Sequence, residues 1–382
     1  MRTFTRSTVM AKVEAGDGMY DQDPQKGNRL EERTTNVRDD STIDQAAKTG
    51  VSRGKKHKLK WMSRPMVLPE TILEFLDEDL RENAIRYLSN FLVEASALTG
   101  IYEDGSNSLN LTEANDLLLF LYQKREDDLD NYFRTGYMVF NSCGTLCILL
   151  QEIVGFYKKM EDEKLDTRSI KRLINVLTLF QSVAANNETR QRFVDACAPN
   201  FLVPLILFKS TNEVFEDVRT IALSVFGILC QGRESRIIKW AIENNIIEVC
   251  HCILENGSEL SKVIAMHILE AILHDNSGIS YICGPKCTHV LDGLIRTWNG
   301  LVNLLAVDQD FSPRLLFHSI RCYIILCRHD KGYDAVKNNL PEAIANGSFH
   351  EMTEKYPMIR ELLHQLLLNV GKEAEVRLSE KW

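Results

Sequence analysis

Ten cysteines, two of them beside a histidine, are the residues of this sequence that come nearest to a metal-ligand pattern. The closest groupings are Cys283-x3-Cys287-x-His289 and Cys250-His251-Cys252. A structural zinc site usually takes paired C-x2-C ligands together with a second pair farther along the chain, and neither grouping has that spacing. A reduced cysteine inside an apolar helical pattern is more often a small core residue. The sequence therefore favours structural thiols and predicts no metal site.

Residues that could carry out catalysis do not form a recognisable constellation. His267 and His274 lie seven residues apart with Asp275 next to the second, but such a pair is more often packed in a core than bound to a metal. The stretch 50–55 superficially resembles a phosphate loop and lacks its spacing, its Ser or Thr after the lysine, and the preceding strand. The sequence has neither a G-x-S-x-G nor an H-E-x-x-H motif. We expect a binding protein without a cofactor rather than an enzyme.

Apolar residues recur at the i, i+3, i+4, i+7 spacing of amphipathic helices in four long stretches, and alternating strand patterns are missing. The four stripes are Ile170, Leu173, Ile174, Leu177, Phe180 and Ala184; Val218, Ile221, Ala222, Val225, Ile228 and Leu229; Leu260, Val263, Ile264, Ile268, Ala271 and Ile272; Leu316, Ile320, Tyr323, Ile324 and Cys327. The fold class predicted is all-α.

The four helices also end alike, each in a short polar turn that leads at once into another amphipathic segment. The turns begin at Asn186, Gln231, Asp275 and His329. Their spacing is in or near the period of roughly 40–47 residues of armadillo and HEAT repeats. One such repeat cannot bury its own apolar face, so stacked repeats share a core and leave a concave groove. The pattern predicts an armadillo-like helical-repeat solenoid.

The first 65 residues differ from the rest in composition. They are poor in large apolar side chains and contain the basic run Arg53–Lys60, which fits either an import or RNA-contacting patch or a solvated linker. We expect a disordered polar and basic extension over 1–65 and the repeat domain over 66–370. Residues 1–60 hold 13 basic and 9 acidic residues, so the remainder of this chain of net charge −8 is acidic. An acidic body argues against nonspecific duplex binding as the main activity.

Length and composition fit an intracellular, soluble protein. The 382 residues are 45% hydrophobic and 26% charged, which is ordinary for a globular chain. No stretch approaches the roughly 18 apolar residues of a membrane helix, and no apolar segment follows Arg2 and Arg6 as in a secretory signal. We expect no membrane contact.

Several short motifs over roughly residues 110–350 resemble those of one known family. They are Leu149–Val154, Asn187–Arg190, Phe215-Glu216-x-x-Arg219, Gly257–Lys262, Gly278-x-x-Tyr281-Ile282-Cys283, Arg314–Leu316 and Arg321–Tyr323. The Gly-Ser-Glu-Leu-Ser-Lys run at 257–262 is the most specific of them. The sequence resembles a divergent paralogue in the Rcd cell-differentiation family, also called Caf-forty, the ninth Not subunit of the CCR–NOT deadenylase complex. The family fold is an armadillo-repeat array.

The resemblance implies a non-catalytic adaptor that links the large Not scaffold subunit to peptide motifs of RNA-silencing or RNA-binding proteins. The expected processes are mRNA turnover by deadenylation, translational repression and transcription control, in cytoplasmic P-bodies and the nucleus. A weak RNA or DNA contact and a homodimer are also implied. The alternative is an armadillo-type protein-binding module that acts outside that complex.

The resemblance also implies three sets of site residues. The scaffold-docking segment of the family, Trp-His-Ser-Phe-Gly-Thr, is Phe-Asn-Ser-Cys-Gly-Thr at 140–145 here, and we expect scaffold contact at Asn141, Cys143, Gly144 and Cys147 on a helix that begins near Phe140. The expected peptide groove contains Ile264, Lys286, Lys331 and Ala335, although Lys286-Cys287-Thr288 replaces the family's Tyr-x-Arg. The expected nucleic-acid cleft contains Arg219, Arg314 and Arg321, whose alternative role is ion pairing within the solenoid.

Overall fold

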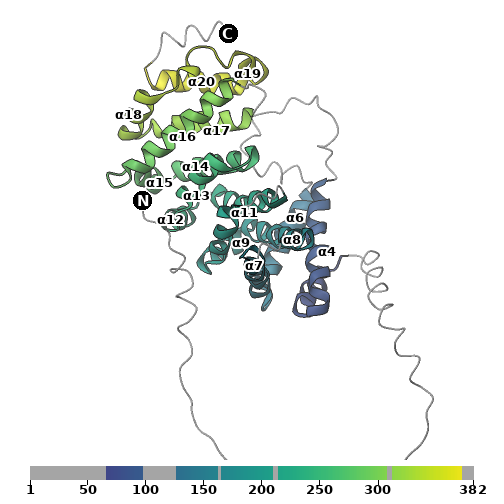
Figure 1. Cartoon of the computed structure of the whole chain (residues 1–382). Coiled ribbons are helices and arrows are strands. Elements are labelled where there is room, and N and C mark those ends of the chain that lie inside the picture. Colours follow the sequence, from purple (N-terminus) through teal and green to yellow (C-terminus); the bar gives the residue numbers. More distant parts are fainter. Residues whose placement is uncertain (1–65, 98–125, 162–164, 210–213, 308–311, 372–382) are drawn as a thin grey trace, which may run out of the picture. The chain divides into compact units, whose positions relative to one another are not determined.

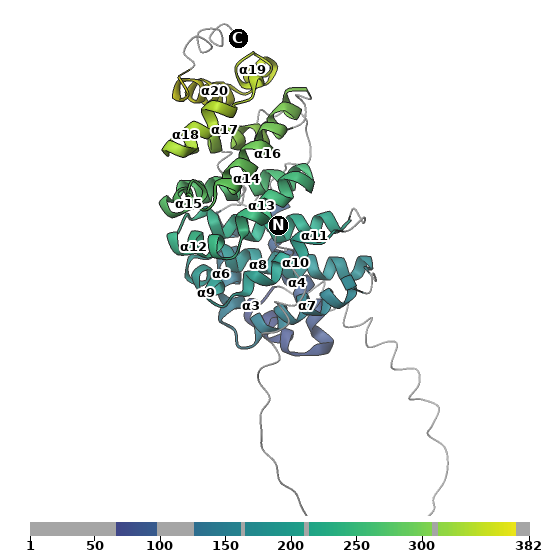
Figure 2. The ribbon, with the colours of Figure 1, turned by 60° about the vertical axis from the view of Figure 1, so that its left-hand side comes forward.

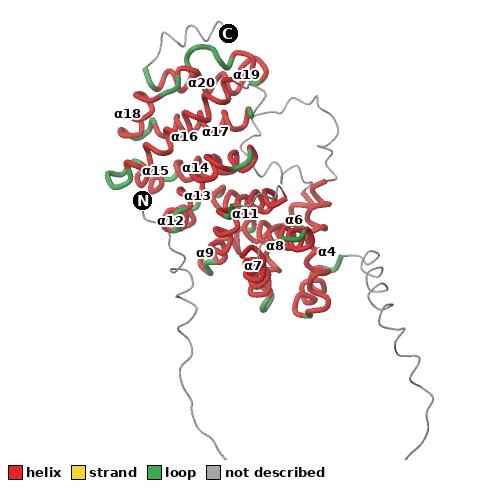
Figure 3. Tube along the Cα trace, in the orientation of Figure 1, coloured by secondary structure: helices red, strands yellow, loops and turns green. Residues whose placement is uncertain are grey.

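The computed structural model describes residues 66–97, 126–161, 165–209, 214–307 and 312–371, and in these ranges the secondary structure is helical (Figure 3). No strand occurs within the described ranges, and the all-α prediction is confirmed. The expected extension over 1–65 lies outside the described residues.

Within the described ranges, five repeats of three helical segments follow one another from teal to yellow (Figure 1). Their bounds are α6 (Glu126–Asn141), α7 (Thr145–Glu161) and α8 (Thr167–Ala185); α9 (Asn187–Asp195), η3 (Ala198–Leu202) with α10 (Val203–Leu207), and α11 (Val214–Gln231); α12 (Ser235–Glu243), α13 (Ile246–Asn256) and α14 (Glu259–His274); α15 (Asn276–Ile282), α16 (Thr288–Val307) and α17 (Pro313–Leu326); α18 (Asp330–Asn339), η4 (Glu342–Ile344) with α19 (His350–Lys355), and α20 (Pro357–Asn369). The segments α3 (Leu68–Leu73), η1 (Glu74–Leu76) and α4 (Glu78–Ala97) precede them.

The third helices of successive repeats pack side by side and form a continuous row through the core. Helix α8 contacts α11, α11 contacts α14, α14 contacts α17, and α17 contacts α20. The same order is visible after a 60° turn (Figure 2). Helix α4 packs against α8 and covers the first repeat. This stacking of three-helix repeats is the armadillo-like solenoid that the sequence predicts.

Short polar residues cap the following helix at two of the four predicted turns, those that begin at Asn186 and Asp275. The side chain of Asn186 accepts hydrogen bonds from the backbone N–H groups of Glu188 and Thr189, at 2.8 and 3.2 Å. Asp275 caps α15 in the same way through the N–H of Ser277, at 2.8 Å. Each cap satisfies donors that a helix start leaves unpaired, which explains why the repeats turn at these positions.

Glycine permits two of these turns to be tight. A Cβ on Gly278 would stand 1.9 Å from the carbonyl oxygen of Ile272, and one on Gly332 would stand 2.3 Å from that of Leu326. The two glycines hold the same place in α15 and α18, third in the helix. Only a residue without a side chain lets the first helix of these repeats approach the end of the preceding third helix so closely.

The predicted apolar stripes are buried in α8, α11, α14 and α17, with a few exceptions. Ile174, Ile221 and Cys327 are half-buried. Leu260 is 50% exposed and is not part of the core, so its place in the third stripe is wrong. It stands in the first turn of α14, directly after the N-terminal Glu259, where the spacing of the stripe continues but no neighbouring helix covers it.

Within the described ranges no single helix is long and apolar enough to cross a membrane. The helix pair Asp130–Asn141 and Thr145–Glu161 has the length and composition of a membrane span only when the two are taken together. The pair is bent by 88°. The buried side of α7 accounts for much of this apolar character.

Replacing Ile264 by alanine tests the core of α14. Its side chain is 2% exposed, so Ile264→Ala should lower the free energy of unfolding by about 2–5 kcal/mol through lost apolar burial and a cavity. The matched control is Leu260→Ala, four residues earlier on the same helix, for which we expect a change within about 0.5 kcal/mol. Urea unfolding followed by circular dichroism measures both. Equal losses would contradict the burial of Ile264 and the exposure of Leu260.

Candidate protein-docking site

The candidate docking surface is the outer face of α7, which follows α6 after a tight turn. The backbone N–H of Thr145 donates to the carbonyl of Ser142, at 3.3 Å, and Gly144 between them has a φ of +77°. Glycine adopts that left-handed conformation without strain, so the chain bends by 88° here and α7 begins at Thr145. The inner face of α7 is buried along Thr145, Ile148, Leu149, Ile153, Phe156 and Met160.

The outer face of α7 borders a shallow apolar hollow of about 420 Å³, called here the α7 hollow. It is lined by Cys147, Leu150, Gln151, Val154, Gly155, Lys158 and, from η3, Phe201. Val154 is 40% exposed, and a Cβ on Gly155 would meet no atom within 4 Å. Exposed apolar groups around a concave surface with an open glycine suit a partner that packs closely against the helix.

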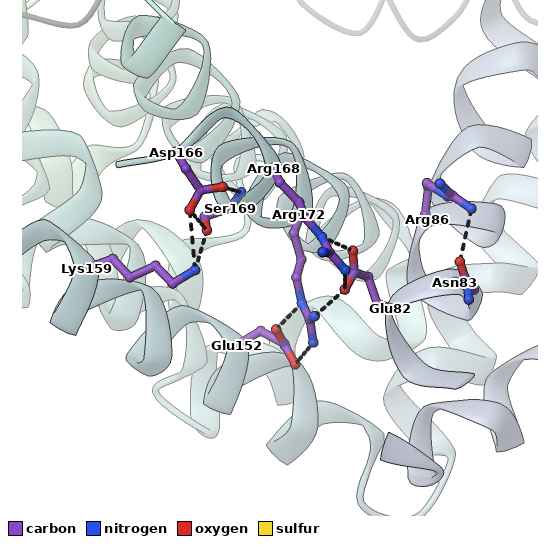
Figure 4. A network of polar contacts seen from close by, with 9 residues as sticks. All are labelled: Glu82, Asn83, Arg86, Glu152, Lys159, Asp166, Arg168, Ser169 and Arg172. Atoms are coloured by element: carbon purple, nitrogen blue, oxygen red, sulfur yellow. Dashed lines mark hydrogen bonds and ion pairs between the residues drawn. The ribbon is translucent and has the colours of Figure 1, made fainter. Parts of the chain in front are cut away.

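Ion pairs fix α7 to the helices beneath it (Figure 4). The guanidinium of Arg172 on α8 donates to both carboxylate oxygens of Glu152 on α7, at 2.6 and 2.7 Å. It also donates to Glu82 on α4, at 2.9 Å, and Arg168 binds both oxygens of the same carboxylate, at 2.8 Å each. A two-pronged arginine–carboxylate pair restricts orientation as well as distance. The network thus orients α7 relative to α4 and α8.

A second contact fixes Phe201 beside α7. The hydroxyl of Tyr157 on α7 donates to the backbone carbonyl of Phe201, and burial raises the pKa of Tyr157 above its ordinary value of 10. Because the phenol stays protonated, it keeps its donor role across the physiological range. The hydrogen bond from Tyr157 therefore keeps Phe201, the η3 residue that lines the α7 hollow, in place against α7.

The four predicted scaffold-contact residues lie around the turn between α6 and α7, from the last residue of α6 to the third residue of α7. Cys143, Gly144 and Cys147 are exposed, so neither cysteine is buried against a neighbouring repeat. Asn141 is exposed at the end of α6 and accepts a hydrogen bond from Arg192, at 2.7 Å. The expected helix start near Phe140 is wrong, because Gly144 separates α6 from α7. Cys143 therefore lies in the turn and not on one helical face with Cys147.

The predicted peptide-groove residues separate into two places. Lys286 and Lys331 are exposed and Ala335 is half-buried, in the α15–α16 loop and on α18. Gly332, next to Lys331, packs against Cys283 at the end of α15, since a Cβ there would lie 3.3 Å from the Cys283 sulfur. Ile264 does not line a groove. It is buried in the core of α14, because helices α11 and α17 pack on both sides of that helix.

Two of the three predicted cleft arginines bind within the chain. Arg219 donates to the backbone carbonyls of Ile206 and Phe208, at 3.0 and 2.6 Å, and so ties α11 to the end of α10. Burial lowers the pKa of Arg219 below its ordinary value. Arg314 is exposed at the start of α17.

The third cleft arginine belongs to a buried polar cluster around Glu270. The carboxylate of Glu270, 4% exposed on α14, accepts from the Nδ1 of His318 at 2.7 Å and from Arg321 at 2.8 Å. His274 and Arg233 lie 3.7 and 4.0 Å from the same carboxylate. A buried carboxylate is tolerated where cations and donors surround it. The guanidinium of Arg321 is thus paired with a buried carboxylate inside the chain.

Two residues of this region, His267 and His274, stand out in the sequence, but the central Glu270 does not. His267 and His274 attracted attention as a pair, whereas Glu270 stands between them on the same helical face. Glu270 lies three residues after one histidine and four before the other, inside an apolar helix. This spacing indicates a buried carboxylate that is paired within the core. Burial holds the pKa of His267 down at about 3, so that imidazole stays neutral.

The cysteines follow the predicted structural role in part. Cys230, Cys250, Cys283 and Cys322 are buried, and burial raises the pKa of Cys230 to about 12. Cys143, Cys147 and Cys197 are exposed. Among the described residues, no group of three His, Cys, Asp or Glu side chains is arranged to hold a metal ion.

Comparison with known proteins identifies relatives over most of the chain. Residues 107–370 match the model of the cell differentiation family, Rcd1-like. The chain is 32% identical over 276 residues to the cell differentiation protein rcd1 of Schizosaccharomyces pombe, covering 72% of this chain and 95% of that protein. It is also 32% identical over 260 residues to the protein CAF40 of Saccharomyces cerevisiae, covering 67% of each.

Among solved structures, similar chains include designed armadillo repeat proteins. One, YIII(Dq)4CqI, is 16% identical, with 80% of this chain and 100% of that chain covered and a TM-score of 0.48. Another, described as designed for modular peptide recognition, is 17% identical, with coverages of 79% and 99% and a TM-score of 0.49. The fold assignment rests on the stacked helices of the chain itself.

The Glu270 cluster should make stability fall in acid. Burial raises the pKa of Glu270, but His274, His318 and Arg321 outweigh it and hold that pKa below the ordinary 4.5. As the pH falls, the unfolded chain therefore takes up the proton first, so the stabilisation is complete above about pH 5 and is lost below it. Denaturant unfolding from pH 7 to pH 3 measures the slope.

In Glu270→Gln that part of the acid slope should disappear. The variant should also lose about 3 kcal/mol of stability at pH 7, because Arg321 and His318 remain buried without a carboxylate. Glu255→Gln, at a half-exposed carboxylate on α13, is the matched control and should keep the slope. An unchanged slope in Glu270→Gln would refute the assignment.

Proposed function

The chain belongs to the Rcd1-like cell differentiation family, and we propose that it is a non-catalytic adaptor of the CCR–NOT deadenylase complex. In this role the armadillo-like scaffold binds the large Not subunit and presents mRNA regulatory factors to the complex. Family membership and the helical-repeat fold support a regulatory binding protein. The complex, the partner and the absence of catalysis are parts of the proposal.

The observation that carries the proposal is the α7 hollow. Its lining begins at Cys147, two residues after the aligned docking motif at 140–145, and faces outward, whereas the inner stripe of α7 is buried. Cys147, Leu150 and Val154 recur at helical spacing on that face, as expected for a helix that packs against a partner. The Glu152–Arg172 pair holds the face in one orientation, which lowers the entropy cost of binding.

Two of the three substitutions in the docking motif, those at Asn141 and Cys143, change the chemistry that the partner meets. A family aromatic is Cys143 here, which removes apolar area from the turn before α7, and a family histidine is Asn141. The amide of Asn141 is already engaged by Arg192, whose guanidinium stands 4.8 Å from the Phe140 ring centre. With fewer anchors at the turn, affinity should depend more on the helical face of α7.

The second candidate is an armadillo-type binding module outside the complex. The changed turn at Asn141 and Cys143 favours it, since docking through that motif is altered. Co-purification separates the two candidates: the large Not subunit recovered with the full chain supports the adaptor, and its absence supports the independent module.

Other expectations from the resemblance remain proposals. Peptide motifs of RNA-silencing or RNA-binding proteins would meet the surface around Lys286, Lys331 and Ala335. A weak nucleic-acid contact would depend mainly on Arg314, because Arg219 and Arg321 already bind within the chain. P-body and nuclear localisation would follow from membership of the complex, and a homodimer is a further proposal.

Cys147→Arg tests the docking face. Cys147 is exposed, so the variant should keep its helicity, while its guanidinium would be buried without a partner in the interface. We expect the affinity for the purified large Not scaffold to fall at least about 30-fold, equivalent to roughly 2 kcal/mol. Isothermal titration calorimetry measures the affinity and circular dichroism the fold.

Cys197→Arg is the matched control. It makes the same change at another exposed cysteine, one that does not line the α7 hollow, and should bind the scaffold normally. A folded Cys147→Arg variant with unchanged affinity would remove the docking site and, with it, the main support for the adaptor role.

A further inference from the structure

A second hollow lies at the other end of the repeat array, between the last two third helices. Called here the C-terminal hollow, it has a volume of about 390 Å³ and is lined by Ile324, Cys327, Arg328, Tyr333, Gln365 and Asn369. These residues come from the end of α17, from α18 and from the second half of α20. The sequence patterns named Ile324 and Cys327 only as members of an apolar stripe, because Gln365 and Asn369, which complete this surface, lie far from them in the chain.

The lining consists of polar donors around an apolar base. Ile324 is 6% exposed, and burial raises the pKa of Cys327 to about 11, so its thiol stays neutral. Arg328, Gln365 and Asn369 are exposed at the rim. Across the described ranges, these three side chains have no hydrogen bond or ion pair that would occupy their donors.

The charge of the hollow has one sign. None of its six lining residues is acidic, and Arg328 supplies a full positive charge. A second cation stands at the edge: the Nζ of Lys337 donates to the hydroxyl of Tyr333 at 3.2 Å and lies 5.3 Å from the ring centre. The phenol oxygen is therefore used as an acceptor, which leaves its O–H free to donate outward.

We propose that the C-terminal hollow binds an acidic peptide segment, with a carboxylate of the peptide on Arg328 and its backbone on the amides of Gln365 and Asn369. Arginine donors match a carboxylate in a two-pronged geometry, and a side-chain amide both donates to and accepts from an extended peptide backbone. Gln365 and Asn369 are four residues apart on α20 and so face the same way. An apolar peptide residue beside the carboxylate fits over Ile324 and Cys327.

The chemistry favours a peptide over a nucleic acid. A nucleic-acid strand needs several phosphate-binding cations along its path and exposed aromatic faces for its bases. This hollow offers one free guanidinium and one aromatic ring, and that ring already carries Lys337 on its face. The proposal does not depend on docking through α7, which lies in the first repeat.

Fluorescence anisotropy of the full chain with two labelled peptides tests the proposal. The probe is Glu-Leu-Glu-Leu-Glu, and its uncharged twin has Gln in place of each Glu. We expect the acidic peptide to bind about tenfold more tightly than the twin at about 50 mM salt, and less so at about 150 mM, because charge screening weakens the pair.

Variants assign the binding to the hollow. Arg328→Gln should reduce the affinity for the acidic peptide to that of the twin, and Gln365→Glu should reduce it further by repulsion. Arg296→Gln, at an exposed arginine on α16 outside the hollow, removes the same charge and should bind as the unmodified chain does. Cys147→Arg should also bind normally, so failure of scaffold docking and failure of this site are distinguishable.

Three results would overturn the proposal. The first is equal affinity for the two peptides. The second is an equal loss in Arg296→Gln and Arg328→Gln, which would show general attraction to the surface. The third is tighter binding of a labelled oligouridylate that Arg328→Gln abolishes, which would assign the hollow to nucleic acid. Circular dichroism establishes that each variant is folded.

Discussion

The structure depends on the lateral packing of its third helices. Helices α8, α11 and α14 are apolar over most of their circumference. Each would expose that apolar surface to water unless a neighbouring helix packed on both sides of it. Burial of this kind contributes about 25 cal/mol for each Å² of apolar area, so the row of third helices makes a large contribution to the core. Stability is then shared between adjacent repeats instead of residing within any one of them.

This constraint also decides which surfaces remain for partners. The third helices are covered by their neighbours, so docking has to use the outer helices or hollows beside the ends of third helices. The α7 hollow is of the first kind: the inner stripe of α7 is buried while Val154 faces outward. The C-terminal hollow is of the second kind, where α17, α18 and α20 meet. Ile264, in contrast, could not serve a partner because α14 has neighbours on both sides.

The fold could be predicted from the sequence because each repeat has local features that indicate its helices and turns. Apolar spacing located α8, α11, α14 and α17, and capping residues such as Asn186 and Asp275 marked the turns between them. The site was only partly predictable. Cys147 could be placed by the aligned motif, but the separation of Cys143 from α7 depends on the left-handed Gly144, which helical spacing does not encode. The Glu270–His318 and Glu152–Arg172 pairs join residues 48 and 20 apart, and their partners emerge only when the helices stack.

The polar groups in this fold fall into two functional kinds, separated by whether their hydrogen bonds are already made. Arg172, Arg219 and Arg321 are satisfied inside the chain, and breaking any of them to bind a ligand would leave a buried carboxylate or carbonyl unpaired. Such residues hold helices in place and are poor recognition groups, even where a family motif includes them. Arg328 is the opposite case, because its donors are free and a ligand can use them without that loss. A surface of this solenoid is therefore available for binding where the hydrogen-bond donors of a cation are unused within the chain. Membership of that cation in a family motif is a weaker indication.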